Sequence, residues 1–304
     1  MSLFRKKNST KIRDSWEDKM LYIISDIILL FVLIIVAYPL IYVVSSSISH
    51  PDAVAGGQVL FLPIKPTLIG YKIVFSYKSV WTGFYNSFYY TILGTIVNMV
   101  FTTLCAYPLS RRNYQGLKLG MTIMTISMMV GGGLIPTYIM VSNMGLTNTR
   151  AIMIILGAFS IGNMLLMRTY FRSSVPQDLI DAAKVDGASD FYTLLKVVLP
   201  LSKAVLSVVT LYYAVGHWNN YFGALIYLRD QSMQPLQCVL RSILNIGNVD
   251  MSQVNDAETA AAMTGANELL KYAMIVVTSV PVIALYPFVQ KYFEKGVMIG
   301  SLKG

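Results

Sequence analysis

Six long apolar stretches recur along the 304-residue chain, and they limit the folds that it can adopt. They cover residues 20–44, 84–108, 119–141, 151–167, 204–228 and 272–290. A helix needs about 20 predominantly apolar residues to cross the hydrocarbon core of a bilayer. The sequence therefore predicts an all-α membrane protein with six transmembrane helices.

The composition agrees with a chain embedded in lipid. Hydrophobic residues make up 55% of it and charged residues only 13%, whereas a soluble domain carries about 25% charged residues. Its two cysteines, Cys105 and Cys238, fall in different environments, so we expect no disulfide. Only His50 and His217 could add imidazole ligands, and we therefore expect no metal site.

The distribution of lysine and arginine predicts the orientation in the membrane. Segments 1–19, 109–118, 168–203 and 291–304 hold 17 of these residues, whereas the alternate segments hold 7. Basic loops face the cytoplasm, so both termini are predicted to be cytoplasmic. The net charge of +9 then reflects topology and lipid contact, and nucleic-acid binding is not expected.

These signals predict five segments. Residues 1–19 form a cytoplasmic N-terminal segment, and 20–44 form a first transmembrane helix that is retained rather than cleaved as a signal peptide. Residues 45–83 form an extracytoplasmic loop. Residues 84–290 form a core of five further helices, and residues 291–304 form a cytoplasmic tail.

A polar island interrupts the apolar pattern at residues 174–200, which read SVPQDLIDAAKVDGASDFYTLLKVVLP. Ser174 and Gln177 have the spacing of a capping box, which predicts a short amphipathic helix. Gly187 is suited to ending that helix, and Ser189 or Asp190 to capping a second one. A helix–turn–helix over 176–198 is either a docking element for another protein or an interfacial connector without a partner.

The glycine run at residues 131–133 interrupts the third apolar stretch. Backbone groups freed at that depth have to be buried in protein or face water, so the run indicates either a simple kink or a wet path.

The chain lacks the residues for catalysis. No Ser-His-Asp set or paired intramembrane carboxylates can be assembled, and no phosphate-binding G-x-x-x-x-G-K-[ST] sequence occurs. Asp26 is best interpreted as an interfacial acid. The central parts of the last five stretches contain no Asp, Glu, Lys or Arg, which argues against an ion-coupled carrier. We expect a non-enzymatic conduit whose energy comes from another subunit.

The polar island resembles a known signature. Asp181-Ala182-Ala183, Asp186-Gly187-Ala188 and Leu199-Pro200 are similar to the E-A-A-x-x-D-G-A…LP sequence of ABC-importer membrane subunits. The resemblance implies a type-I ABC importer fold in which this segment is a cytoplasmic coupling helix seated in a cleft of the ATPase. The coupling residues it implies are Asp181, Ala182, Ala183, Asp186, Gly187, Ala188 and Pro200. Aspartate replaces the family's glutamate at 181, which keeps the charge and shortens its reach.

Further segments resemble carbohydrate-uptake permeases related to the smaller membrane subunit of the maltose importer. These are QKYFEKGVMIGSLKG at the C-terminus, HWNNYF at 217–222 and the residues Asn86-Ser87. The loop from 48 to 75 is similar to a subgroup serving complex oligosaccharides, including uronate-containing ones. The resemblance implies a bacterial cytoplasmic-membrane complex with a second permease, two ATPase subunits that bind ATP and Mg²⁺, and an extracytoplasmic sugar-binding protein. It implies no cofactor in this chain.

The C-terminal tail has two interpretations. In the maltose family the corresponding tail reaches the ATPase interface, which would make Lys295, Gly296 and Gly300 contact residues. Glycine-rich ends are otherwise often frayed.

Aromatic and amide side chains are the residues that would bind sugar along a pathway. The candidates are Asn163, Tyr212, Tyr213, Trp218, Asn219 and Tyr221. Tyrosine and tryptophan near span ends are more often interface residues, so the assignment of each one is open.

The sequence thus predicts a permease that moves a sugar by alternating access, driven by ATP hydrolysis on its partners. Two alternatives stay open. An ion-coupled secondary carrier would transport without an ATPase, and a membrane interaction protein would transport nothing.

Overall fold

The computed structural model describes residues 15–111, 114–246, 267–285, 287 and 290. Within these ranges all regular secondary structure is helical and no β-strand occurs, which confirms the predicted all-α class. The helices are α1 (Trp16–Ser47), α2 (Pro51–Ala55), α3 (Ile69–Ser76), α4 (Lys78–Ser110), α5 (Leu117–Met129), α6 (Leu134–Asn143), α7 (Arg150–Ile155), α8 (Ile161–Ser174), α9 (Gln177–Val185), α10 (Asp190–Thr193), the π-helical turn η1 (Leu194–Val198), α11 (Leu199–Leu201), α12 (Lys203–Trp218), α13 (Tyr221–Tyr227), the 3₁₀ turn η2 (Gln231–Met233) and α14 (Leu236–Ile246). A last described helix spans Asn267–Leu285.

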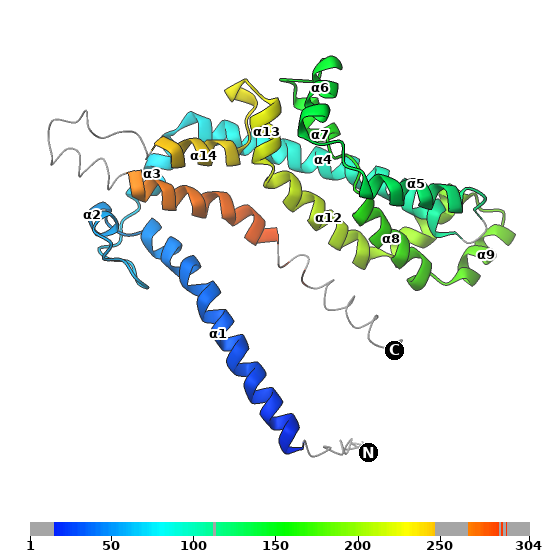
Figure 1. The fold of residues 1–304 in the computed structure, drawn as a ribbon, viewed down its shortest axis with the longest axis horizontal. Helices are drawn as coiled ribbons and strands as arrows, with labels where there is room; N and C mark the ends of the chain where they lie inside the picture. The colour runs from blue at the N-terminus through cyan, green and yellow to red at the C-terminus, as the bar shows by residue number, and fades with distance from the viewer. Residues whose placement is uncertain (1–14, 112–113, 247–266, 286, 288–289, 291–304) are drawn as a thin grey trace, which may run out of the picture.

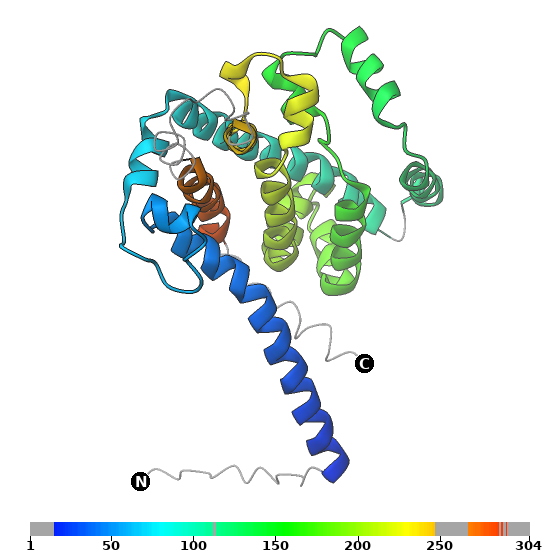
Figure 2. The same cartoon turned by 60° about the vertical axis from the view of Figure 1, so that its left-hand side comes forward.

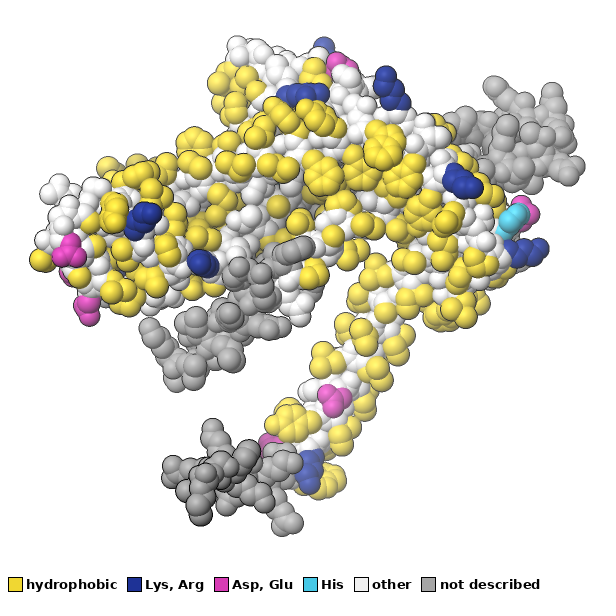
Figure 3. All heavy atoms as spheres, turned by 180° about the vertical axis from the view of Figure 1, so that it is seen from behind, with side chains coloured by type: hydrophobic (Ala, Val, Ile, Leu, Met, Phe, Trp, Pro, Cys, Tyr) yellow, Lys and Arg dark blue, Asp and Glu magenta, His cyan; other side chains and the backbone are white. Residues whose placement is uncertain are grey.

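Helix α1 extends away from the rest of the chain (Figures 1 and 2). Ser15 caps it, because its hydroxyl accepts the backbone N–H of Asp18 while the Asp18 carboxylate accepts that of Ser15. Its 32 residues span ~48 Å, and only three serines at its far end are buried. Hydrophobic side chains cover this helix (Figure 3). An apolar surface of that extent belongs in lipid or against another protein.

Helix α4 is the central packing element, and it contacts α7, α8, α12 and α14. Small and short polar residues recur along its buried face at helical spacing: Gly83, Ser87, Thr91, Gly94, Asn98, Thr102 and Ala106. Such residues let helix backbones approach closely and provide hydrogen bonds between helices in a membrane protein. This face explains why α4 gathers the other helices around it (Figure 1).

Breaks divide three of the six apolar stretches. Helices α5 and α6 meet at 112° around the glycine run, where Gly133 has φ 75°, so the predicted interruption is confirmed. The stretch 151–167 is divided into α7 and α8, and the stretch 204–228 into α12 and α13. The expectation of one continuous helix over each of those two stretches is therefore wrong.

The break between α7 and α8 is stabilised by side chains from other helices. The carbonyl of Gly157 accepts the Asn98 Nδ2 amide at 2.6 Å, and the Ser160 N–H donates to the Tyr213 hydroxyl at 3.2 Å. Asn98 Oδ1 and His217 Nε2 are hydrogen-bonded at 2.6 Å. Because irregular backbone within a membrane requires protein partners, these contacts explain how the chain can stop and restart a helix there.

Length and composition identify three helices that could cross a membrane within the described ranges, or up to five when each of two bent pairs is one span. The three are α1, α4 and Asn267–Leu285; the pairs are α5 with α6, and Asp190–Leu201 with α12, which meet at 87°. The six-span count predicted from the sequence thus stays a prediction.

The two segments predicted as outer loops also contain helices. Residues 45–83 include α2 and α3, and α4 already begins at Lys78. Residues 229–271 include α14, which packs on α4. Helix α14 has leucine, valine and isoleucine on one face and polar residues on the other, a pattern that the sequence displays and that the loop prediction overlooked.

Candidate functional site

The polar island folds as the predicted pair of helices, α9 and α10, joined by a tight turn. Gly187 has φ +79°, and its N–H donates to the Lys184 carbonyl at 3.0 Å. Ala188 N–H donates to the Ala183 carbonyl at 2.9 Å, which completes the helix end. No atom lies within 4 Å of where a Gly187 side chain would begin. The glycine is therefore required by its backbone conformation and not by crowding.

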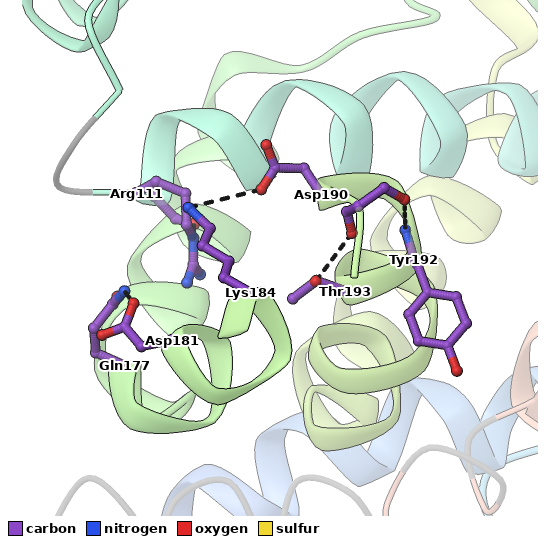
Figure 4. A network of polar contacts seen from close by, with 9 residues as sticks. Arg111, Gln177, Asp181, Lys184, Asp190, Tyr192 and Thr193 are labelled. Atoms are coloured by element: carbon purple, nitrogen blue, oxygen red, sulfur yellow. Dashed lines mark hydrogen bonds and ion pairs between the residues drawn. The ribbon is translucent and has the colours of Figure 1, made fainter. Parts of the chain in front are cut away.

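Helix α10 begins as predicted, whereas α9 does not. The Ser189 hydroxyl accepts the Tyr192 N–H at 3.2 Å and so caps α10 (Figure 4). The predicted capping box of Ser174 with Gln177 is wrong, because Ser174 is the last residue of α8 and Pro176 occupies the N-cap of α9 without a side-chain bond. Helix α8 continues to within two residues of Pro176, so Ser174 still has helical backbone.

One fully buried side chain anchors α9. Ile180 is 0% exposed and belongs to a hydrophobic cluster that includes Phe171 of α8, Leu194 and Val198 of η1 and Val209 of α12. Burying an isoleucine contributes about 1.5–3 kcal/mol relative to leaving it exposed. Because α9 has only 9 residues and is too short to be stable by itself, this anchor seats it on the body of the protein.

The opposite face of α9 is exposed and combines acid, alanine and apolar groups. Asp181, Ala182 and Asp186 are exposed, and the Asp181 carboxylate accepts the Gln177 amide at 3.0 Å (Figure 4). Val185 is 88% exposed and lies one residue before the turn. Beyond the turn Phe191 and Tyr192 are also exposed. An apolar tip with an acidic edge, held on a rigid base, has the composition of a surface for another protein.

Sequence reasoning missed Val185, Phe191 and Tyr192 as members of this surface. They are apolar residues within a polar island, and that was the available signal. Their exposure depends on the turn at Gly187 and on the packing of Ile180, which local spacing does not specify.

Two arginines connect the base of this unit to α4. Arg168 of α8 donates through Nε to the Leu109 carbonyl of α4 at 2.7 Å, and Arg111, which follows α4, donates through Nη2 to the Phe171 carbonyl of α8 at 3.5 Å. Burial lowers the pKa of Arg111, while the negative charge of Asp190 acts in the opposite direction. A hydrogen bond from a charged donor to the carbonyls at the end of α4 is also favoured by the helix dipole.

Between α4 and the α9–α10 unit lies a cavity of about 380 Å³. It is lined by Leu104, Tyr107, Pro108, Arg111, Tyr114, Lys184, Asp190, Phe191 and Leu194. Lys184 and Asp190 form an exposed ion pair of 3.9 Å across the turn (Figure 4). Such an exposed pair contributes little to stability. Ile180 and the two arginines therefore provide most of the stabilisation that holds the α9–α10 unit to α4 and α8.

Pro200 lies where the α9–α10 unit joins the next long helix. The π-helical turn η1 and the short helix α11 precede α12, and α12 starts at Lys203 after the 87° bend. Proline has no N–H to donate to a carbonyl one turn earlier, which suits its place in the first turn of α11. Ala182 and Ala183 lie on α9 and Ala188 follows Gly187, and their role in coupling stays a prediction. Lys295, Gly296 and Gly300 lie outside the described residues.

The predicted sugar-contacting residues are not gathered at one place. Trp218 is 4% exposed and its indole donates to the Thr278 carbonyl at 3.0 Å, so it serves packing against the last described helix. Tyr213 is buried and bonded to Thr102. Tyr212 is half exposed on α12, and Asn163 lies in the first turn of α8.

Asn219 and Tyr221, by contrast, lie together at the break between α12 and α13. Both are exposed, and the amide of Gln237 on α14 donates to Asn219 Oδ1 at 3.4 Å. No group of three or more His, Cys, Asp or Glu that could hold a metal ion occurs in the described part of the chain.

These features define a helical membrane protein with a central small-residue helix, broken spans and an anchored, exposed helix–turn–helix. Residues 11–299 match the model of the family described as "binding-protein-dependent transport system inner membrane component". The chain belongs to this family of membrane components of transport systems.

Known relatives match over most of their length. The chain is 36% identical over 266 residues to protein LplC of Bacillus subtilis, covering 88% of this chain and 89% of that protein. It is 34% identical over 280 residues to YtcP, the polygalacturonan/rhamnogalacturonan transport system permease protein of the same organism, covering 91% and 96%.

A solved structure shares the fold. A chain from the crystal structure of a bacterial ABC transporter involved in the import of the acidic polysaccharide alginate superposes with a TM-score of 0.82 and 34% identity. The match covers 92% of this chain and 99% of that one. The type-I ABC importer fold predicted from the signature is thereby confirmed.

Proposed function

We propose that this chain is a permease subunit of an ATP-driven importer that moves an oligosaccharide across the cytoplasmic membrane. The family match and the saccharide-transport relatives support this proposal. The observation that carries it is the α9–α10 unit, in which Ile180 is buried while Asp181, Ala182 and Val185 are exposed. A surface of this kind can transmit force only if its base is fixed and its tip engages another subunit.

The proposal includes partners that supply what this chain lacks. ATP and Mg²⁺ bind two separate ATPase subunits, one of which seats the α9–α10 tip. A second permease subunit covers part of the exposed apolar surface of α1, α5 and α6, and an extracytoplasmic binding protein delivers the sugar. Both termini of this chain and the α9–α10 unit lie in the cytoplasm, consistent with the lysine and arginine distribution.

The contacts suggest how motion passes into the membrane. Closure of the ATPase pair displaces α9, and Ile180 transfers the displacement to the cluster shared by α4, α8 and α12. Arg168 holds the end of α4 to α8, so these helices move as one unit. Tilting of this unit opens the pathway alternately to each side of the membrane, and ATP hydrolysis resets it.

The acidic edge of the tip provides the test. Asp181→Lys should leave the amount of assembled complex in the membrane unchanged while uptake falls at least tenfold, because reversing the charge replaces a charge-assisted bond with repulsion. Asp178→Lys is the matched control, since Asp178 lies on the same helix and is also exposed. ATP-dependent uptake of oligosaccharide by vesicles, together with ATPase activity, gives the readout.

Three outcomes would count against the proposal. Full uptake by the Asp181→Lys complex would remove the coupling role. Uptake driven by an ion gradient without any ATPase would establish a secondary carrier, and the absence of flux under all conditions would indicate an interaction protein.

A further inference from the structure

Helix α14 presents a stripe of polar and apolar residues that borders the start of α13. Gln237, Leu240, Arg241 and Leu244 recur at the spacing of one helical face, and together with Tyr221 they line a cavity of about 340 Å³. The other face of α14 is buried, with Leu236 at 0% and Ile243 at 8% exposure. The stripe is therefore directed toward the start of α13.

Arg241 is the charged group of this cavity, and its charge is not neutralised within the described chain. Its guanidinium carbon lies 5.5 Å from the centroid of the Tyr221 ring, which is a cation–π distance. No Asp or Glu in the described ranges forms an ion pair with Arg241, and its N–H groups donate to no described residue. Among the described residues no anion occupies the fork of the guanidinium, whose geometry suits a carboxylate.

An amide pair borders the same cavity. Gln237 donates to Asn219 at 3.4 Å, which is a long bond. Both amides have further donors and acceptors that suit hydroxyl groups. Tyr221 is 42% exposed, so part of its ring is open to a ligand.

The position of the cavity separates it from the coupling unit. Its lining includes Tyr221, the first residue of α13, next to the end of α12, whereas α9 and α10 precede the start of α12. Helix α9 lies well apart from α13 and α14 in Figure 1. Arg241 is also one of only seven lysines and arginines on the side that the charge distribution leaves poor in cations. Transporters commonly form substrate sites where a helix is broken, and Arg241 adds a positive charge beside such a break.

We propose that Arg241, Tyr221 and Gln237 form a contact site for an acidic saccharide, with Arg241 binding the carboxylate of a uronic acid residue. The inference rests on the proposed function and specifies its substrate class. A planar guanidinium binds a carboxylate bidentately, and an aromatic ring offers an apolar face to the C–H groups of a sugar. The amides of Gln237 and Asn219 bind the hydroxyl groups.

Binding to the full chain in phosphatidylcholine nanodiscs tests this site without the binding protein. Trigalacturonate and its fully methyl-esterified form differ in charge and hardly in shape, and saturation-transfer NMR detects weak binding of either. Wild-type protein should bind the acid at least tenfold more tightly than the ester. Arg241→Gln should remove that preference, and Arg241→Lys should restore part of it, because lysine keeps the charge without the planar fork.

Arg229→Gln is the control. Arg229 is an exposed arginine of the same segment, and it contacts the Tyr138 hydroxyl rather than lining the cavity. Equal binding of the acid and the ester, an effect of Arg229→Gln as large as that of Arg241→Gln, or displacement by a phosphate-bearing lipid headgroup in place of the saccharide would each overturn the site. Its failure would leave ATP-dependent uptake of neutral oligosaccharide intact, whereas failure of the proposed function would abolish uptake of every saccharide.

Discussion

The seating of α9 can be tested by shortening the side chain that anchors it. Ile180→Ala removes three carbon atoms from a position that is 0% exposed, and such a change costs about 2–5 kcal/mol where the site cannot collapse. The other side chains of α9 are exposed or half-buried. Most of that cost should therefore appear as local opening of α9 rather than as global unfolding.

The size of the expected change in hydrogen exchange follows from the equilibrium between closed and open α9. A loss of about 3 kcal/mol raises the open population of α9 by about two orders of magnitude, since about 1.4 kcal/mol corresponds to a tenfold change. Hydrogen exchange measured by mass spectrometry on the purified complex should show residues 177–193 exchanging about 100-fold faster, with α4 unchanged. Uptake should fall while ATP hydrolysis persists, because an α9 helix that is detached from the hydrophobic cluster transmits little displacement to it.

Two matched variants support the interpretation. Ile180→Val costs only about 0.5–1.5 kcal/mol and should show a proportionally smaller effect. Leu179→Ala alters the neighbouring side chain, which is 45% exposed, and should leave exchange nearly unchanged. Hydrogen exchange of α9 at the wild-type rate in Ile180→Ala, or opening of α4 together with α9, would refute the claim that this one side chain anchors α9.

Three further substitutions test other parts of the structure. Gly187→Leu should destabilise the α9–α10 turn by about 1–2 kcal/mol, because residue 187 has a positive φ and the space around it is otherwise open. Faster hydrogen exchange confined to residues 177–193 would show this effect. Hydrogen exchange at the wild-type rate would contradict it. Gly94→Ala should lower the melting temperature of the complex, because the added methyl group would press on the ring of His217. An unchanged melting temperature would refute the close approach of α4 to His217. Tyr213→Phe removes the hydroxyl's 2.7 Å bond to Thr102 and its 3.2 Å bond from the Ser160 N–H, and it should cost about 1–3 kcal/mol in a denaturation assay. A more stable protein would show that this hydroxyl is not needed.

Local features of the candidate site could be predicted from sequence. Gly187 and Ser189 act within a few residues of themselves, so residue type and spacing were sufficient to place the turn and the cap of α10. The cap proposed at Ser174 failed because whether α8 ends there depends on packing, including the burial of Phe171 one turn earlier.

The breaks in the fourth and fifth apolar stretches could not be predicted from hydropathy. Residues on both sides of each break are apolar, so the hydropathy averaged over a span-length window stays high across it. The α7–α8 break is stable because Asn98 and Tyr213, which lie 59 and 53 residues away from the groups they bind, supply its hydrogen bonds. The cavity at Arg241 likewise depends on α14 meeting α13, and this contact is invisible until both helices are placed.

The central claim is that the exposed tip of the α9–α10 unit binds an ATPase subunit, and photo-crosslinking from that tip tests it most directly. A benzophenone amino acid in place of Val185, which is 88% exposed, should crosslink to the ATPase subunit in the assembled complex. The same group in place of Leu225, which is 46% exposed on α13, should not. Crosslinking of Val185 to lipid, to the extracytoplasmic binding protein or to no ATPase at all would contradict the account.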